Sequence, residues 1–178
     1  KELNTNGEIA KKVMSLSEIA IHEGVDTVVV ATSGNVALVP TFEAVKKGKN
    51  IAIANKETII MAGEQLTSLA ESNSVNLMPI DSEPSAIWQC LRGEDSNISK
   101  LIITASGGPF RNTPVGSLSN VTPSNALQHP TWKMGPKISV DSATMMNKAF
   151  EVIEARWLFN VPWENIEVVV HPESIIHS

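Results

Sequence analysis

Short apolar, β-branched runs alternate with stretches of helical length along most of this chain. The runs at 26–31, 51–54, 75–80, 101–104 and 167–170 predict buried strands. The stretches at 9–20, 36–47 and 57–72 have helical spacing, and Pro84 can occupy the first turn of a further helix. Strands that alternate with helices in this way indicate βαβ units, and therefore a parallel sheet within an α/β fold.

The alternation stops between Ser106 and Lys137, where prolines and glycines stand without a sustained period. A loop of this length in a compact domain is usually functional, often as a lid. The stretch from Ser142 to Phe159 then predicts the longest helix. A domain boundary near Pro79 fits this change of pattern.

Composition excludes several classes of protein. The net charge is −5, from 14 Lys+Arg against 19 Asp+Glu, which leaves no basic footprint for nucleic acid. No apolar stretch is long enough to span a bilayer, and no signal peptide precedes the first helix. The single cysteine, Cys90, excludes an internal disulfide, fits a reducing compartment, and is expected to be packed and inert. The chain starts without Met and stops at 175–178 in what resembles the start of a strand, so we expect a fragment of a longer protein.

Two carboxylates follow the third predicted strand, in the sequence Asp81-Ser82-Glu83. In an open α/β sheet, ligands bind at the carboxyl ends of the strands. Carboxylates this close repel each other unless a cation joins them, and hard divalent cations prefer oxygen ligands. The alternative is a solvated turn whose negative charge is favoured by the dipole of the next helix.

The predicted helix from Ser142 to Phe159 has two distinct sides. Its apolar stripe consists of Met146, Ala149, Phe150, Ile153 and Trp157. Asn147, Glu151 and Glu154 lie on the other side, with Lys148 at its margin. This side is either a solvated face with one Lys148–Glu151 pair or, with Ser142, a set of donors for a phosphate at a helix start.

Three further segments have both a structural and a functional interpretation. Ser106-Gly107-Gly108 is either a plain turn or a place where backbone N–H groups approach an anion. In Asn55-Lys56-Glu57, Lys56 can contact a phosphate or an enediol oxygen, or Asn55 simply caps the next helix. His129, near Trp132, either closes over a ligand or is structural, and no His pair has the spacing of a zinc site.

Five segments are distinctive when taken together: ANKE (54–57), DSE (81–83), SGGPFRNTP (106–114), HPTWKMGPKISVDSATMMNKAFEVIEARWLF (129–159) and HPESIIHS (171–178). They closely resemble the 1-deoxy-D-xylulose 5-phosphate reductoisomerases, which are NADPH- and divalent-metal-dependent enzymes of the non-mevalonate isoprenoid pathway. The resemblance covers essentially the whole chain, is densest from Ala54 onward, and is most specific between His129 and Phe159.

The resemblance implies a role for each of the residues considered above. The metal (Mg²⁺, Mn²⁺ or Co²⁺) would be held by Asp81, Glu83 and Glu151, and the substrate phosphate by Ser106, Ser142, Asn147 and Lys148. Ser82, Lys56 and His129 would contact the rest of the substrate, while Asn55, Glu57 and Gly135 would touch NADPH. The catalytic group would be Lys56, Asp81, Glu83, Glu151 and His129, and Trp132 and Met134 would lie on a mobile loop.

The resemblance also implies an architecture and a setting. Residues 1–79 would form the C-terminal part of an incomplete Rossmann-like NADPH-binding domain, and 80–178 part of an α+β catalytic domain that binds metal and substrate. The full-length protein would be a homodimer acting on a phosphorylated sugar, with no nucleic-acid or membrane partner. It would be located in a bacterial cytoplasm, or in a plastid if the source is eukaryotic.

The chain departs from the family in several places. The family's glycine-rich nucleotide motif, its first βαβ unit and its C-terminal helical domain are absent, so we expect no turnover by this chain alone. Pro84 stands where many members have His, Glu173 where Gln is expected and Ala105 where Gly is common. The alternatives are a non-catalytic oligomerisation or binding module that keeps the fold, and a generic nicotinamide oxidoreductase of the homoserine-dehydrogenase type.

Overall fold

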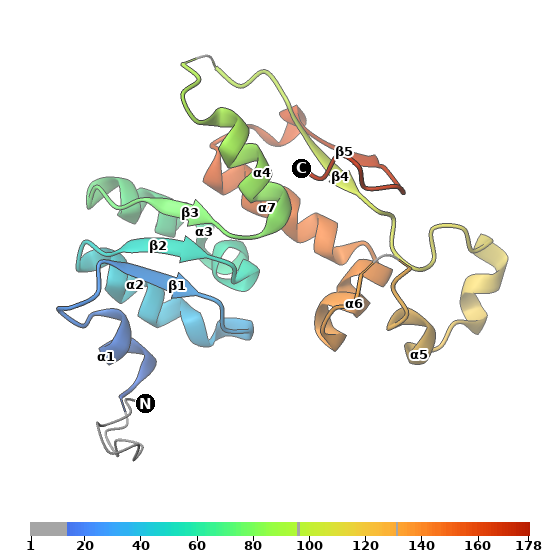
Figure 1. The fold of residues 1–178 in the computed structure, drawn as a ribbon, viewed down its shortest axis with the longest axis horizontal. Coiled ribbons are helices and arrows are strands. Elements are labelled where there is room, and N and C mark those ends of the chain that lie inside the picture. Colours follow the sequence, from blue (N-terminus) through green and yellow to red (C-terminus); the bar gives the residue numbers. More distant parts are fainter. Residues whose placement is uncertain (1–13, 96, 131) are drawn as a thin grey trace.

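A three-stranded parallel sheet forms the first half of the protein, in a computed structural model that describes residues 14–95, 97–130 and 132–178. Strands β1 (Thr27–Val30), β2 (Asn50–Ile53) and β3 (Leu77–Pro79) lie in sequence order, with Val28 opposite Ile51 and Ile51 opposite Leu77 (Figure 1). The connections run through α2 (Leu38–Lys46), preceded by the 3₁₀ turn η1 (Gly34–Ala37), and through α3 (Lys56–Ser72). The predicted βαβ order and parallel sheet are thus confirmed.

Local sequence signals start and stop these helices. The Asn55 side chain accepts a hydrogen bond from the Thr58 N–H at 2.8 Å and so caps α3 at the end of β2. Gly48 follows α2 with φ +71°, a left-handed conformation that few other residues adopt without strain. The side chains of Ile51 and Ile53 on β2 are fully buried with Ile59 and Leu66 of α3, and this packing fixes the strand–helix layer.

A second, two-stranded parallel sheet pairs segments far apart in the chain. Strand β4 (Leu101–Ala105) lies beside β5 (Ile166–Val170), with Leu101 opposite Ile166. Helix α4 (Ser82–Leu91) precedes β4, and the 3₁₀ turn η3 (Trp163–Asn165) precedes β5. Ile87, Leu101, Ile103 and Val161 form a separate buried core between these elements.

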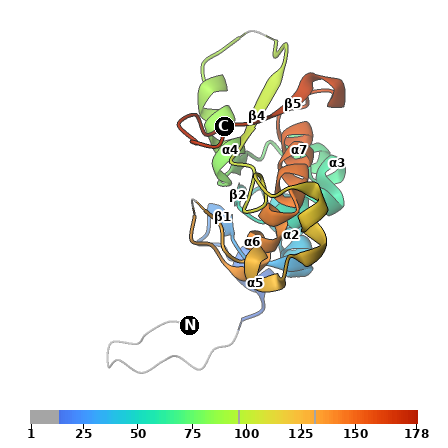
Figure 2. The same cartoon turned by 90° about the vertical axis from the view of Figure 1, so that its right-hand side faces the viewer.

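Helix α7 (Met146–Leu158) lies between the two sheets in both views (Figures 1 and 2). Trp157 and Leu158 pack against the first core, whereas Val152 and Ala155 belong to the second. This helix therefore holds the two halves together and presents its N-terminal turns between them.

The helix predicted from Ser142 to Phe159 is wrong at its start. Ser142 belongs to a separate helix, α6 (Pro136–Ala143), and α7 begins only at Met146. Between them Met145 has φ +61°, and this left-handed residue changes the chain direction. The longest helix is α3, with 17 residues, rather than α7 with 13.

The rest of the chain follows the expected pattern, apart from the exposure of Cys90. In the described part of the segment from Ser106 to α6, the only elements are the short helices η2 (Val115–Asn120) and α5 (Pro123–Ala126). The first predicted helix is α1 (Leu16–Ala20), capped by Ser15; residues 9–13 of that prediction lie outside the described part of the chain. Cys90 is exposed, which contradicts the expectation of a packed thiol; it lies in the last turn of α4, beyond the turn that buries Ile87. None of the described helices has the length and apolar character needed to cross a bilayer.

Candidate functional site: a carboxylate cluster between two sheets

Two acidic side chains lie where the chain leaves β3 and enters α4. Asp81 occupies the N-cap position of α4, and Glu83 stands in its first turn. Asp81 is half-buried, and Glu83 is buried at 7 % exposure. The short strand and immediate helix thus place both carboxylates at the carboxyl end of the first sheet, where ligands of such sheets bind.

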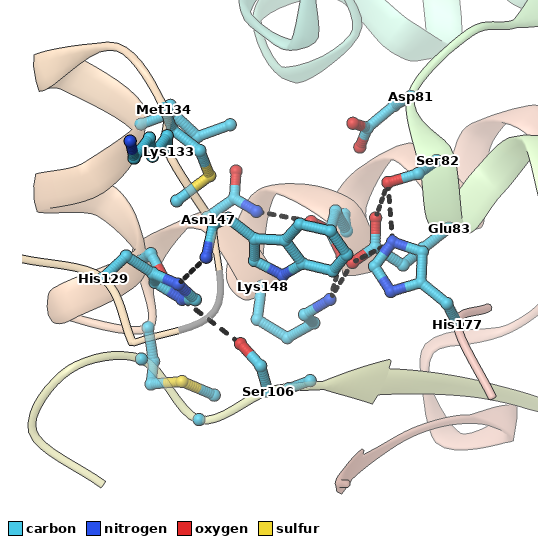
Figure 3. A pocket seen from close by; sticks show the side chains of 18 residues that line it. Asp81, Ser82, Glu83, Ser106, His129, Lys133, Met134, Asn147, Lys148 and His177 are labelled. Carbon is cyan, nitrogen blue, oxygen red and sulfur yellow. Dashed lines mark hydrogen bonds and ion pairs between the residues drawn. The ribbon is translucent and has the colours of Figure 1, made fainter. Parts of the chain in front are cut away.

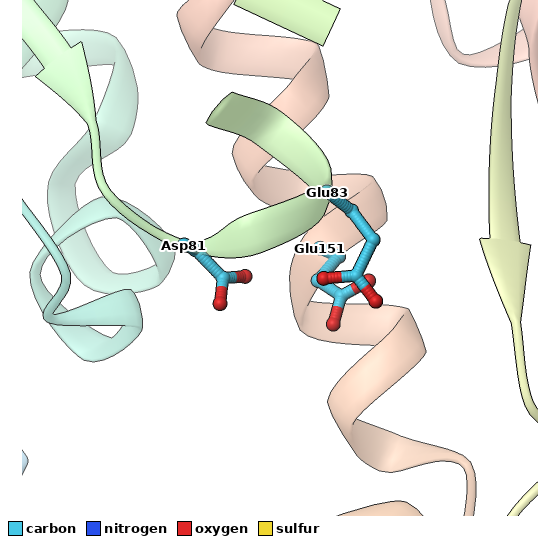
Figure 4. Close-up of side chains that lie close together, drawn as sticks. All are labelled: Asp81, Glu83 and Glu151. Carbon is cyan, nitrogen blue, oxygen red and sulfur yellow. The ribbon is translucent and has the colours of Figure 1, made fainter. Parts of the chain in front are cut away.

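Glu151 reaches the same point from α7. Its side chain is fully buried, and one ligand atom from each of Asp81, Glu83 and Glu151 lies within 4.8 Å of the others (Figure 4). The structure therefore brings together three carboxylates from two elements that are well separated in the sequence. Oxygen ligands at such spacing suit a divalent cation such as Mg²⁺ or Mn²⁺.

Lys148 lies among the carboxylates rather than free at the helix start. Its Nζ donates to Glu83 at 2.8 Å, to the Thr104 carbonyl oxygen at 2.5 Å, and to Glu151. An ammonium group has three donors, and all three are engaged in these contacts. The solvated Lys148–Glu151 surface pair considered from the sequence is wrong, because both side chains are buried.

Lys56 supplies a second positive charge from the first turn of α3. Its Nζ contacts Asp81 directly and lies 3.6 Å from Glu151 and 3.5 Å from Glu154. Lys56, just beyond the end of β2, therefore lies on the same side of the sheet as Asp81. Four carboxylates, from Asp81, Glu83, Glu151 and Glu154, thus face two ammonium groups.

Burial and the neighbouring charges shift the pKa values of these carboxyl groups. Burial raises the pKa of Glu151 to about 7, and the adjacent Glu83 carboxylate acts in the same direction. Burial also raises the pKa of Glu154 to about 8. Burial alone would raise the pKa of Glu83 too, but Lys148 and Ser82 outweigh it and lower that pKa. Fully ionised, the cluster has two more negative than positive charges, which one divalent cation would neutralise.

Asn147 and Ser82 orient the carboxylates. The Asn147 Nδ2 donates to Glu151 at 2.5 Å, while its Oδ1 is buried without a hydrogen-bond partner among the described residues. Ser82 Oγ donates to Glu83 at 2.7 Å. Asn147 therefore acts on Glu151 here and keeps one acceptor unsatisfied.

The turn after β4 packs closely against α6. Gly107 and Gly108 have φ of +89° and +69°, and a Cβ on Gly108 would lie 2.5 Å from the Ser142 carbonyl oxygen. This contact requires glycine at position 108 and brings Ser106 and Ser142 to one wall of a cavity.

His129 joins this turn to the loop beyond it. The Trp132 N–H donates to its Nδ1 at 3.0 Å, so the neutral ring carries its proton on Nε2, which lies 3.3 Å from Ser106 Oγ (Figure 3). Burial, followed by the positive charge of Arg111, lowers the pKa of His129 and favours this neutral form.

His177 also enters the site, although sequence reasoning assigned it no role. Because Ser82 Oγ donates its own proton to Glu83, it accepts a hydrogen bond from the N–H of His177 Nε2 at 2.9 Å. The Trp132 ring lies 5.8 Å from the His177 ring, centroid to centroid. Ser178 lies beside β4 and forms hydrogen bonds with Thr104, and this contact places the neighbouring His177 at the wall of the cavity. The run HPESIIHS (171–178) contributed to the family resemblance, but the spacing of its two histidines indicated no function for His177.

These side chains surround a cavity of about 460 Å³ (Figure 3). It is lined by the carboxylate cluster (Asp81, Glu83, Glu151), by polar residues from five segments (Ser82, Ser106, His129, Lys133, Ser142, Asn147, Lys148, His177), and by Ala105, Gly107, Gly108, Trp132, Met134, Ile138 and Met145. Trp132 and Met134, expected on a mobile loop, are both part of the wall.

The residues expected to touch NADPH lie beside this cavity and do not line it. Asn55 is buried, and its side chain both caps α3 and donates to the carbonyl oxygens of Thr32 and Gly34 at 2.5 and 3.0 Å. Glu57 pairs with Lys137 at 3.2 Å, two residues beyond Gly135 at the start of α6. Helix capping by Asn55 is therefore present, and the Glu57–Lys137 pair links the start of α3 to the start of α6 near Gly135.

Comparison with known proteins gives consistent matches over most of the chain. The family model described as "1-deoxy-D-xylulose 5-phosphate reductoisomerase" matches residues 1–63, and the model of the C-terminal domain of the same family matches 77–159. The enzyme of that name from Heliobacterium modesticaldum is 54% identical over 92% of this chain, and that from Clostridium acetobutylicum is 50% identical over 100%. The chain spans 42% and 46% of the length of these two relatives.

Solved structures give the same result. A crystal structure of DOX-P reductoisomerase with NADPH, fosmidomycin and magnesium superposes with a TM-score of 0.85 at 43% identity, over 91% of this chain and 42% of that one. The Zymomonas mobilis enzyme with NADPH has a TM-score of 0.82 at 45% identity, over 91% and 41%. Fold and sequence thus agree, and the chain belongs to the 1-deoxy-D-xylulose 5-phosphate reductoisomerase family.

Proposed function

We propose that the full-length protein carrying these residues converts 1-deoxy-D-xylulose 5-phosphate to 2-C-methyl-D-erythritol 4-phosphate, using NADPH and a divalent cation. The observation that carries this proposal is the meeting of Asp81, Glu83 and Glu151 in one buried cluster on the wall of a polar cavity. The activity named for the relatives, and the NADPH and magnesium named in the related structures, support it.

The metal would be held by Asp81, Glu83 and Glu151. These residues fit a divalent cation because all three side chains offer carboxylate oxygens, and because their excess negative charge needs a cation. When bound, the ion polarises the carbonyl and hydroxyl oxygens of a substrate as a Lewis acid. Asn147 and Ser82 fix the orientations of Glu151 and Glu83 through hydrogen bonds of 2.5 and 2.7 Å.

The substrate phosphate would lie on the opposite wall of the cavity. Ser106 and Ser142 meet there across the close Gly108 contact, and Asn147 lines the same cavity, where its Nδ2, which donates to Glu151 in this structure, would be the group that donates to a phosphate oxygen. Lys148 would join them once the charges of Glu83 and Glu151 no longer engage its ammonium group. Ser82, Lys56 and His129 would contact the remainder of the substrate.

NADPH would bind at the starts of α3 and α6, which Asn55 and Gly135 precede and which the Glu57–Lys137 pair connects. Residues 1–79 would belong to the nucleotide-binding domain and residues 80–178 to the catalytic domain, with α7 packing on both cores. The hydride comes from the cofactor, and the protein orients the substrate and excludes water. We propose a homodimer for the full-length protein.

A direct assay tests this function. The full-length protein, given 1-deoxy-D-xylulose 5-phosphate, NADPH and Mg²⁺ or Mn²⁺, is expected to oxidise NADPH and form 2-C-methyl-D-erythritol 4-phosphate. Chelation by EDTA should abolish the reaction, and added metal should restore it. The 178-residue chain alone is expected to give no turnover. Absence of product from the full-length protein with every metal would refute the proposal.

Metal affinity is expected to rise with pH. Burial raises the pKa of Glu151 to about 7, so below that pH a proton occupies the carboxyl and must leave before a cation binds. Affinity of the full-length protein for Mg²⁺ should therefore increase by up to about tenfold per pH unit between roughly pH 6 and 7, with less change above. Isothermal titration in two buffers of different ionisation enthalpy measures both the affinity and the protons released. A pH-independent affinity would contradict the protonated state of Glu151.

A further inference from the structure

Glu154 is a buried carboxylate that the metal and substrate assignments leave without a role. It lies one turn beyond Glu151 on α7 and is 1 % exposed. Its Oε2 is 3.5 Å from Lys56 Nζ and accepts no hydrogen bond from any described residue. Burying an acidic group costs free energy unless it is paired, and the neighbours that Glu154 has are the Lys56 ammonium and the Asp81 carboxyl.

Glu154 stands apart from the group of carboxylates that can share a cation. That group consists of Asp81, Glu83 and Glu151. Lys56 lies between the two sets, because its Nζ also contacts Asp81 and lies 3.6 Å from Glu151. The ammonium group is thus surrounded by three carboxylates, of which only Glu154 lies outside the proposed metal ligands.

The three contacts of Lys56 differ in what they can do once a cation binds. Oxygens of Asp81 and Glu151 that bind a cation have less negative charge to offer Lys56. Glu154 binds no cation in this assignment and keeps its position on α7, so in its ionised form it still attracts the Lys56 ammonium across 3.5 Å. A lysine side chain without such a partner adopts many rotamers. A fixed counter-charge restricts them before the substrate binds, so less entropy is lost when Lys56 contacts the substrate.

We propose that Glu154 is a positioning residue: it holds the Lys56 ammonium at the edge of the metal cluster, where Lys56 can meet a substrate oxygen. This inference rests on the proposed function for its catalytic consequence, but not for the Glu154–Lys56 contact itself. Electrostatics agree with it, since burial lowers the pKa of Lys56 and the carboxylates overcome that effect, Glu154 most strongly.

A double-mutant cycle in the full-length protein tests the proposal. Glu154→Gln keeps the shape and removes the charge, and should lower kcat by roughly 10- to 100-fold, as loss of a supporting partner does. Its affinity for Mg²⁺, measured by titration, should change by less than about threefold. In a Lys56→Met background, Glu154→Gln should cause almost no further loss of kcat, because its effect passes through Lys56. Glu164→Gln, an exposed substitution of the same kind, should leave kcat unchanged.

A chemical measurement independent of turnover completes the test. With Mg²⁺ saturating, acetic anhydride should label Lys56 several-fold faster in Glu154→Gln than in the parent, while labelling of exposed Lys100 stays the same. Additive losses in the cycle, unchanged Lys56 labelling, or a loss of Mg²⁺ affinity as large as that of Glu151→Gln would each overturn the positioning role. If the parent protein lacks turnover but Glu154→Gln still speeds the labelling of Lys56, the proposed function is refuted, whereas the role of Glu154 in holding Lys56 is supported.

Discussion

Glu151→Gln is expected to abolish metal-dependent turnover of the full-length protein while leaving its fold intact. Glu151 is the only one of the three clustered carboxylates that comes from α7, and its side chain is fully buried between two lysines. The amide keeps the volume but offers a neutral oxygen in place of an anion. Turnover should fall by more than about 10²-fold, beyond the usual cost of losing a supporting partner of a metal ligand.

Stability should respond in the opposite sense to activity. Because the pKa of Glu151 is raised from 4.5 to about 7, the folded protein binds this proton more tightly than the unfolded chain. Ionising the group therefore costs stability progressively as pH rises from about 4.5 to 7, and a glutamine removes that cost. The Tm of Glu151→Gln at pH 8 should accordingly equal or exceed that of the parent when metal is absent.

Three measurements check this variant: Mg²⁺ titration, turnover with 1-deoxy-D-xylulose 5-phosphate, and thermal unfolding. Glu167→Gln is the matched control, because Glu167 lies on the exposed side of β5 in a surface pair with Lys100 at 2.7 Å. Such a pair contributes little, so the control should behave as the parent. Retained metal-dependent turnover by Glu151→Gln would overturn its assignment as a ligand.

The sheet could be predicted because its strands are short runs of apolar and β-branched residues. Runs such as Thr27–Val30 and Ile51–Ile53 contain almost only apolar or β-branched residues, and the intervening segments have helical period. The pairing of β4 with β5 could not be predicted, because about sixty residues separate Leu101 from its partner Ile166. Only the tertiary fold decides which distant strands meet.

The site was partly predictable for a related reason. Asp81 and Glu83 follow a strand directly, so their place at the sheet edge is a local property. Their meeting with Glu151 depends on how α7 crosses both cores, which periodicity does not specify. Reasoning from helical faces also considered Glu151 and Glu154 as solvated, whereas both are buried and Met146 of the supposed apolar stripe is exposed. A buried charged cluster inverts the usual pattern of an amphipathic helix.

Gly63→Val should destabilise the full-length protein more than most single substitutions. The Trp157 ring of α7 lies directly on Gly63 of α3, and a Cβ there would lie 2.5 Å from the ring's Cγ. Helix α3 departs from helical geometry at Ala62, with φ −149° and ψ 32°, immediately before this contact. Overpacking of this kind costs about 1–3 kcal/mol, and the indole has little room because it also packs edge-on against Trp163 with centroids 6.4 Å apart.

The change should also reach the metal site, because Trp157 and Glu151 lie on the same helix. A displaced α7 would move Glu151 away from Asp81 and Glu83, so Gly63→Val should weaken Mg²⁺ binding as well as lower the urea midpoint of unfolding. Gly116→Ala is the control: a Cβ there meets no atom within 4 Å, and its effect should stay within about 0.5 kcal/mol. An unchanged urea midpoint for Gly63→Val would mean that Trp157 can move without cost, and α7 would then not be the rigid link between the two cores.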